Sequence, residues 1–295
     1  MPVAIVLLNY NDYENTRKYI ENVREYKSIE KIVIVDNKST AKDEVKKLES
    51  LTSKKVDLVV SDKNGGYSYG NNVGVKYLEK KYPNKFRQII ISNPDVFVDD
   101  TTISYLEDYM NKNENVAVVA PRMFYKNGPA RRSSWKKRTI LIDIANSTRL
   151  TEFLLYFVFK HGEYCKNDYE KEVLEVDAIA GSFFMIDFNV LKKIGYFDEN
   201  TFLFYEEDIL GEKVRKCGHI IVSLNNLKFI HFESQTIGKA MNMFRKVDIL
   251  FKSKIYYNKV YNKANFLSIA IFNMLKYVRK FELLFEIPIR KLLRK

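Results

Sequence analysis

The stretch "VAIVLLNYND", from Val3 to Asp12, decides the fold, because a short apolar run ends abruptly in a polar cluster. A continuous apolar run of this length predicts a strand buried on both faces. The pattern returns in "KIVIVDNKST" (Lys31–Thr40) and "RQIIISNPD" (Arg87–Asp95), with amphipathic stretches between them. Alternating strands and helices predict an α/β fold, with a Rossmann-like, mainly parallel sheet flanked by helices.

Composition divides the chain of 295 residues unevenly. The net charge is +12, and residues 239–295 alone hold 14 Lys or Arg and 3 Asp or Glu. We therefore expect a body over residues 1–238 and a basic, amphipathic helical tail over residues 239–295. The two cysteines are far apart and have no metal or redox spacing, which favours a reduced, cytoplasmic protein.

Four polar clusters follow the first four predicted strands. In a parallel sheet the carboxyl ends of the strands meet at one edge, where ligands bind. Each cluster alone is also typical of a turn. Together they predict a nucleotide site, whose candidate residues are Asn9, Tyr10, Asn11, Asp36, Asn64, Gly65, Gly66, Asn72 and Asn93.

The glycine-rich cluster "NGGYSYGNN" (Asn64–Asn72) fits neither of the common phosphate-binding patterns. Tyr67 stands where a dinucleotide fingerprint has its middle glycine, and Asn71 stands where a P-loop has its lysine. The cluster "NPD" instead offers Asp95 as a ligand for Mg²⁺ or Mn²⁺, which prefer oxygen and are often completed by substrate phosphates.

Three consecutive acids, Glu206, Glu207 and Asp208, lie in the apolar surroundings of "FLFYEEDILGEK". Like charges so close together raise one another's pKa, and an apolar setting adds to the cost of each charge. Three interpretations of these acids are open: they cap a helix, they bind a metal, or they perform proton chemistry. The helix-capping interpretation is compatible with either of the others.

Six motifs in order resemble family 2 glycosyltransferases, nearest to their rhamnosyltransferase-like branch in bacterial surface polysaccharide synthesis. They are "VLLNYND", "IVDNKST", "NGGYSYGNNVGV", "ISNPDVFV", "AGSFFMIDFNVLKKIGYFDENTFLFYEEDIL" and "FIHFES", from about Val3 to Glu233. The resemblance implies a GT-A fold and inverting transfer of a sugar, with rhamnose as the first candidate. The donor would be a nucleoside-diphosphate sugar, and the acceptor a hydroxyl on a growing, lipid-linked saccharide.

The resemblance also implies roles for matching residues. Asp95 would bind the metal, and His231 would lie near the metal or the diphosphate. Asp208 would be the catalytic base, with Glu207 beside it, because a sugar hydroxyl needs help as its proton leaves. Asp36 would read the nucleobase or ribose.

The basic segments have functional and plain interpretations. "RRSSWKKR" (Arg131–Arg138) is either a solvated loop or a loop that contacts an anionic substrate. In the tail, Leu283, Leu284, Ile287, Leu292 and Leu293 nearly form one stripe. A basic amphipathic helix suits an anionic membrane, here the inner face of the plasma membrane. A helix packed on the body, or a homodimer contact, is the alternative.

Two other classes of protein compete with this interpretation. The high isoelectric point would suit a nucleic-acid-binding protein, but the charge is confined to the tail and no nucleic-acid motif occurs. A sugar nucleotidyltransferase of related topology would need a glycine-rich first loop, and "NYNDYENTRKY" is not one. We expect no nucleic-acid partner.

Overall fold

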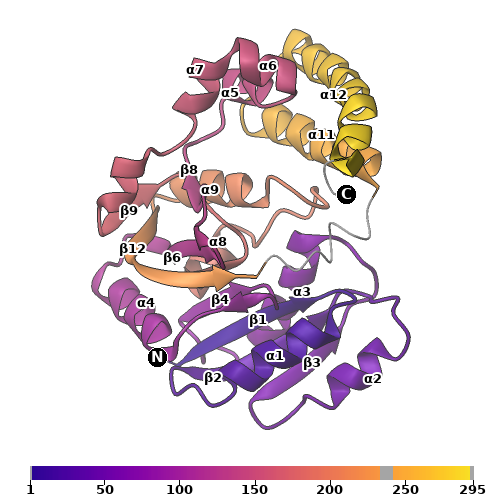
Figure 1. The fold of residues 1–295 in the computed structure, drawn as a ribbon. Coiled ribbons are helices and arrows are strands. Elements are labelled where there is room, and N and C mark those ends of the chain that lie inside the picture. Colours follow the sequence, from indigo (N-terminus) through magenta and orange to yellow (C-terminus); the bar gives the residue numbers. More distant parts are fainter. Residues whose placement is uncertain (1, 233–241, 293–295) are drawn as a thin grey trace.

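The computed structural model of the protein describes residues 2–232 and 242–292, which form a mixed α/β body and a helical end (Figure 1). The strands of the body are β1 (Val3–Asn9), β2 (Ile29–Asp36), β3 (Val56–Val60), β4 (Gln88–Ser92), β5 (Val96–Phe97), β6 (Val116–Tyr125), β7 (Gly128–Pro129), β8 (Ser134–Trp135), β9 (Val173–Val176), β10 (Ala178–Ile179), β11 (Phe183–Asp187) and β12 (Ile220–His231). Its helices are α1 (Tyr13–Val23), α2 (Glu44–Glu49), α3 (Tyr67–Lys81), α4 (Asp100–Lys112), α8 (Phe188–Lys193) and α9 (Glu206–Lys216), with a 3₁₀ turn at Lys166–Glu170. The helical end holds α5 (Ile140–Ala145), α6 (Arg149–Leu154), α7 (Tyr156–His161), α11 (Met243–Val260) and α12 (Phe266–Leu292).

The main sheet has the order β3-β2-β1-β4-β11-β6-β12-β5. Strands β1 to β4 are mutually parallel, and their register aligns the carboxyl ends: Asn9 lies opposite Asp36, Asp36 opposite Val60, and Leu7 opposite Ser92. The predicted edge of polar clusters is therefore present. It lies where the strand order reverses at β1, the usual place for a ligand in such sheets.

One feature of the sheet departs from simple alternation. Strand β6 does not pair with β4, because β11 lies between them and is antiparallel to both. The pairing between Phe183 and Ser92 brings the start of β11 to the polar edge. Apolar periodicity predicts that a strand exists but leaves its neighbours open, so this insertion was not predictable from the pattern.

Helices cover both faces of the sheet and bury one apolar cluster on each. Ile20 of α1 and Leu106 of α4 pack on one face, with the buried side chains of β1, β2 and β12. Val75 and Leu78 of α3 pack on the other face. Sheet residues such as Val6 and Ile91 have no exposed surface, as expected for strands covered on both sides.

The helical end joins two segments that are far apart in the sequence, since α12 packs on α11 and on α5. Helix α11 also packs on the body: Ser253 donates a hydrogen bond to the carbonyl of Leu203 at 2.8 Å, and Tyr256 donates to Asp198 at 2.8 Å. The predicted domain boundary at residues 238 and 239 lies outside the described residues. The division into body and tail therefore stays a prediction.

Candidate active site

The first two strand ends form a buried polar network beneath the edge. Asn9 and Asp36 have no exposed surface, and Nδ2 of Asn9 donates to Oδ1 of Asp36 at 3.0 Å. Oγ1 of Thr16 donates to Oδ1 of Asn9 at 2.8 Å, and the backbone N–H of Ser39 donates to Oδ2 of Asp36 at 3.1 Å. These two candidate residues are therefore bonded to each other and to the turns at the edge.

Tyr10 and Asn11 lie above that network and keep part of their surface exposed. Asn11 has a left-handed backbone (φ 53°), a conformation that asparagine tolerates better than most residues. Its Oδ1 accepts hydrogen bonds from the backbone N–H groups of Thr40 at 2.7 Å and Ala41 at 2.8 Å. The turns after β1 and β2 are thereby held together at the edge.

The glycine-rich cluster also lies at the edge. Oδ1 of Asn64 accepts from the N–H of Gly66 and from Nδ2 of Asn37, both at 3.2 Å. Gly66 has φ 90°, and a Cβ there would lie 2.0 Å from the carbonyl oxygen of Phe202. Only glycine fits this close approach, which joins the cluster to the segment that precedes the three acids.

The other members of this cluster have structural contacts. A Cβ on Gly65 would meet the ring of Tyr69 at 2.3 Å. Asn72 is buried, and its Nδ2 donates to the carbonyl of Phe197 at 2.9 Å and to Oε1 of Glu199 at 2.7 Å. Asn72 therefore ties α3 to residues 197–199, and its amide is engaged within the protein.

Asn93 and Asp95 follow β4, as the sequence predicts, and a distant strand brings His231 to them. Strand β5 pairs with β12 so that Val96 lies opposite His231. Nε2 of His231 is 3.2 Å from Oδ2 of the buried Asp95. Among the described residues no group of three or more His, Cys, Asp or Glu forms a metal cluster. A carboxylate and an imidazole would instead fit a cation that is completed by diphosphate oxygens and water.

The three acids form the first turn of α9, after a strained entry. Phe204 and Tyr205 both have φ 72°, which is uncommon for a residue with a side chain and costs free energy. The turn directs Glu206 inward, where burial and then the charge of Glu207 raise its pKa well above the usual range. The positive end of the helix dipole partly offsets the repulsion among the acids.

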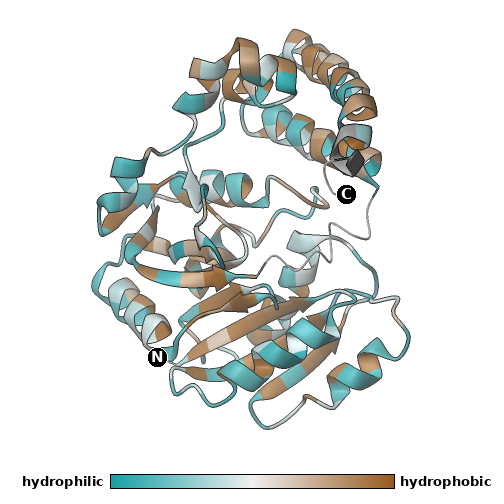
Figure 2. Cartoon of the chain, in the orientation of Figure 1, coloured by the Kyte–Doolittle hydropathy of each residue, from teal (hydrophilic) through white to brown (hydrophobic). Residues whose placement is uncertain are grey.

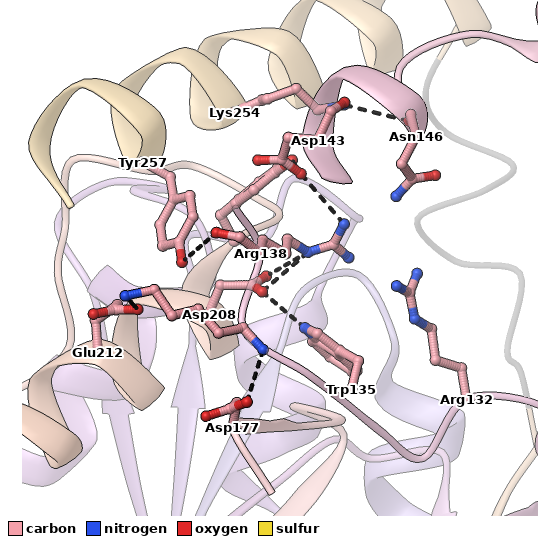
Figure 3. A network of polar contacts seen from close by, with 12 residues as sticks. Arg132, Trp135, Arg138, Asp143, Asn146, Asp177, Asp208, Glu212, Lys254 and Tyr257 are labelled. Carbon is pink, nitrogen blue, oxygen red and sulfur yellow. Dashed lines mark hydrogen bonds and ion pairs between the residues drawn. The ribbon is translucent and has the colours of Figure 1, made fainter. Parts of the chain in front are cut away.

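Asp208 lies deepest and is held by the basic loop (Figure 3). Nε1 of Trp135 donates to its Oδ1 at 2.8 Å, and Nε of Arg138 donates to both carboxylate oxygens, at 3.0 and 3.1 Å. Burial raises the pKa of Asp208, and the Arg138 charge and the Trp135 hydrogen bond oppose that shift. The Arg138 guanidinium also lies 5.3 Å from the ring centre of Tyr205.

A second buried acid extends the network to the C-terminal helices. Asp143 of α5 has no exposed surface and accepts hydrogen bonds from Tyr205 at 2.8 Å and from Nδ2 of Asn258 at 2.6 Å. Its Oδ1 lies 3.5 Å from Nη1 of Arg138. Lys254 donates to the carbonyl of Asp143 at 3.0 Å, and burial lowers the pKa of that lysine to about 8. Helix α11 therefore contacts the pocket that holds Asp208 and Asp143, which we call the acid pocket, through Lys254 and Asn258.

Glu207 differs from its two neighbours because part of its surface stays exposed. Its Oε1 accepts a hydrogen bond from the N–H of Gly181 at 3.2 Å, and Tyr67 donates to the carbonyl of the same glycine. Burial raises the pKa of Glu207 to about 7, and the charge of Asp208 adds to the shift. A partly exposed carboxylate with this pKa can accept a proton near neutral pH.

The basic loop is less solvated than one of its two predicted interpretations requires. Trp135 and Arg138 are largely buried against Asp208, so a solvated loop does not describe them, and a contact with an anionic substrate stays a prediction. Asp143, Lys254 and Asn258 were not candidates at all. The signal that pointed to the loop was one tryptophan among five basic residues, and nothing in that pattern identifies the partner.

Comparisons with known proteins agree with this fold. Residues 4–195, more than half of the chain, match the family model described as Glycosyl transferase family 2. The structure resembles that of GalNAc-T7 solved with UDP, GalNAc and Mn²⁺, with a TM-score of 0.65 and 12% identity over 88% of this chain and 48% of that one. The fold is that of the GT-A glycosyltransferases. The chain belongs to glycosyl transferase family 2.

Two curated relatives match most of the chain. It is 25% identical over 206 residues to the low-salt glycan biosynthesis hexosyltransferase Agl10 of Haloferax volcanii. The aligned region covers 70% of this chain and 59% of Agl10. It is 20% identical over 244 residues to the rhamnosyltransferase WbbL of Escherichia coli K12. The aligned region covers 79% of this chain and 86% of WbbL. The chain thus spans less than two thirds of Agl10. The family match ends at residue 195, before the acids of α9.

Proposed function

We propose that this glycosyltransferase moves a sugar from a nucleoside-diphosphate donor to a hydroxyl group with inversion at the sugar carbon. The proposal depends on one observation: the polar edge of the sheet lies next to the three acids of α9. The strand-end edge with Asp95 and the first turn of α9 are joined by the contact between Gly66 and Phe202. A single displacement needs both parts: one to hold the leaving diphosphate, the other to remove a proton from the acceptor.

Within the acid pair, we assign Glu207 as the base that accepts the proton of the acceptor hydroxyl, and Asp208 as the neighbour that keeps Glu207 basic. The resemblance assigns them in the opposite order. Asp208 is buried, and both of its oxygens accept hydrogen bonds from Arg138. Glu207 keeps part of its surface exposed, and partial burial and then the charge of Asp208 raise its pKa. Asp208 then keeps Glu207 basic, while Arg138 and Trp135 keep Asp208 in place.

Asp95 and His231 would hold a divalent cation, Mg²⁺ or Mn²⁺. Such a cation neutralises charge that grows on the leaving diphosphate. Mn²⁺ is present in the GalNAc-T7 structure, which supports this assignment. Asn93 and the N–H groups around Gly66 lie at the same edge and would orient the donor.

For the donor sugar we propose rhamnose, and for the acceptor a lipid-linked saccharide of a cell-surface polysaccharide. The match to a rhamnosyltransferase along most of its length supports the sugar. Tyr10, Asn11 and Asn64 would contact the nucleotide, whereas Asn9, Asp36 and Asn72 would position those contacts. The protein would work in the cytoplasm, at the inner face of the plasma membrane. No helix among the described residues is long and apolar enough to cross a membrane.

A ligand panel tests the proposal directly. Thermal unfolding is measured with dTDP, UDP and GDP, each with and without Mn²⁺, and a ligand at about 100 times its dissociation constant adds roughly 2.7 kcal/mol to stability. We expect one nucleotide to stabilise the protein most, and only with the cation. Asp95→Asn should abolish the effect of the cation, whereas the exposed Asp108→Asn on α4 should not. Stabilisation by generic DNA and by no nucleotide would contradict the proposal.

A further inference from the structure

Helix α12 exposes an apolar face to solvent in addition to the apolar residues Phe272, Leu275 and Leu283 that it buries. Among the residues of α12 up to Pro288, whose side chains the structure describes, seven large apolar ones are exposed, and Phe266 is 89% exposed. They are Phe266, Leu267, Met274, Tyr277, Phe281, Leu284 and Phe285. Their spacing at 3.6 residues per turn places all of them within about one third of the helix circumference. Of the stripe expected from the sequence, Leu284 is exposed, whereas Leu283 is buried.

Four charged residues of α12 form ion pairs within the helical end. Arg279 pairs with Glu282 at 2.8 Å and with Glu286, and Lys280 pairs with Asp248 of α11 at 2.6 Å. These three acids are the only acids of residues 239–295. The acids of this segment are therefore paired within the helical end, and the segment as a whole keeps a net positive charge.

A second set of exposed apolar residues lies beside the first. On α6 and α7, Phe153 is 79% exposed and Phe157 is 87% exposed, and Leu154 lies between them. Glu282 of α12 accepts hydrogen bonds from the N–H groups of Arg149 and Leu150, both at 3.0 Å, so the start of α6 is fixed to α12. Figure 1 places α6, α7 and α12 together at the end of the molecule away from β2 and β3. In Figure 2, α12 is largely hydrophobic, whereas α2 at the opposite end is largely hydrophilic.

We propose that α6, α7 and the exposed stripe of α12 form one surface that inserts into a bilayer containing anionic lipids. This apolar stripe is about 30 Å long from Phe266 to Phe285, and contiguous exposed apolar surface of this kind marks an interaction site. A helix with this composition lies in the interface of a bilayer, with its apolar face among the acyl chains. The basic excess complements anionic headgroups, whereas two copies of the chain would bring like charges together. The proposal deepens the proposed membrane location and does not depend on the sugar chemistry.

Co-sedimentation of the full chain with phosphatidylcholine vesicles, with and without added phosphatidylglycerol, tests the surface. We expect the protein to bind vesicles that contain phosphatidylglycerol. The double variant Phe281→Ser/Phe285→Ser should lower the partition coefficient about a hundredfold, since burial of each phenylalanine is worth roughly tenfold. Phe153→Ser/Phe157→Ser should act similarly. Tyr105→Ser, which removes an exposed aromatic side chain from α4, is the matched control and should bind like the unmodified protein.

A second measurement separates insertion from loss of folding. Phe157→Trp adds an exposed tryptophan to a chain whose only other one, Trp135, is buried. Its emission should shift to the blue when vesicles with phosphatidylglycerol are added. No binding and no shift would overturn the proposal, as would a dimer in sedimentation velocity that Phe281→Ser/Phe285→Ser disperses. Thermal stabilisation by nucleotide without vesicles should persist in all variants, so failure of this surface is distinct from failure of the transferase function.

Discussion

The polar edge of the sheet and the acid pocket around Asp208 and Asp143 are built in different ways. At the edge, Asn9 and Asp36 end β1 and β2, Asn64 lies in the turn after β3, and neighbouring strand ends and turns supply their hydrogen-bond partners. In the acid pocket, Asp208 depends on Arg138, and Asp143 depends on Asn258 of α11. The edge is thus built from the sheet and its turns, whereas the pocket also includes contacts from the loop around Trp135 and from the helical end. Variants at the edge should alter nucleotide binding, and variants in the pocket should alter the chemical step.

The largest expected effect is that of Glu207→Gln. Removal of a general base lowers kcat by about 10²- to 10⁴-fold and leaves nucleotide binding unchanged. Glu206→Gln changes a buried acid of the same turn and should leave kcat nearly unchanged. Steady-state kinetics with a saturating donor measure both. If Asp208→Asn removes activity and Glu207→Gln retains it, the base is Asp208, as the resemblance assigned.

The next effect is that of Arg138→Ala on the whole fold. It leaves the Asp208 and Asp143 carboxylates without their shared cation, and breaking a buried ion pair costs about 3–5 kcal/mol. Chemical denaturation should report that loss in the free energy of unfolding. Arg131 is in the same loop, but its side chain is 74% exposed, so Arg131→Ala should change stability by less than about 0.5 kcal/mol. Equal effects of the two variants would mean that the pocket does not depend on this ion pair.

At the edge, Gly66→Ala should weaken nucleotide binding and cost about 1–3 kcal/mol of stability. The added Cβ has both an unfavourable φ and a clash with the carbonyl of Phe202. Gly218→Ala is the matched control, because Gly218 has φ 85° and no atom lies within 4 Å of the added Cβ. The difference between the two variants in nucleotide titrations isolates the clash. If Gly66→Ala changed kcat and left nucleotide affinity unaltered, then nucleotide binding and the chemical step would not divide between the edge and the acid pocket.

The smallest effect is a pH dependence confined to the acid pocket. Glu207 acts as a base only when deprotonated, and its pKa is raised to about 7. We therefore expect kcat/KM to rise with pH, by about tenfold per unit below pH 7, and to level off above it. Nucleotide affinity at the edge should not follow this curve. A midpoint near the ordinary value of 4.5 would show that an exposed carboxylate governs the rate.

Much of the fold was predictable because its signals are local. Apolar runs of strand length and polar residues after them predicted β1 to β4 and the edge at which they end. The insertion of β11 was not predictable, since its pairing with β4 joins Phe183 to Ser92. Within the site, the sequence identified Glu207 and Asp208 but ranked them without knowing which is buried. Burial depends on the loop around Trp135, whose partner Asp208 is 73 residues away.

The sequence by itself determined the family, the α/β class, the polar edge and the presence of an acid cluster. These depend on residue type and on spacing within a few residues, which fix backbone preferences and strand faces. Only the tertiary structure decided which acid faces solvent, which cation holds the other, and which face of α12 points outward. Those properties arise from contacts between segments as far apart as Asp143 and Asn258, 115 residues from each other, and no local pattern encodes such a pairing.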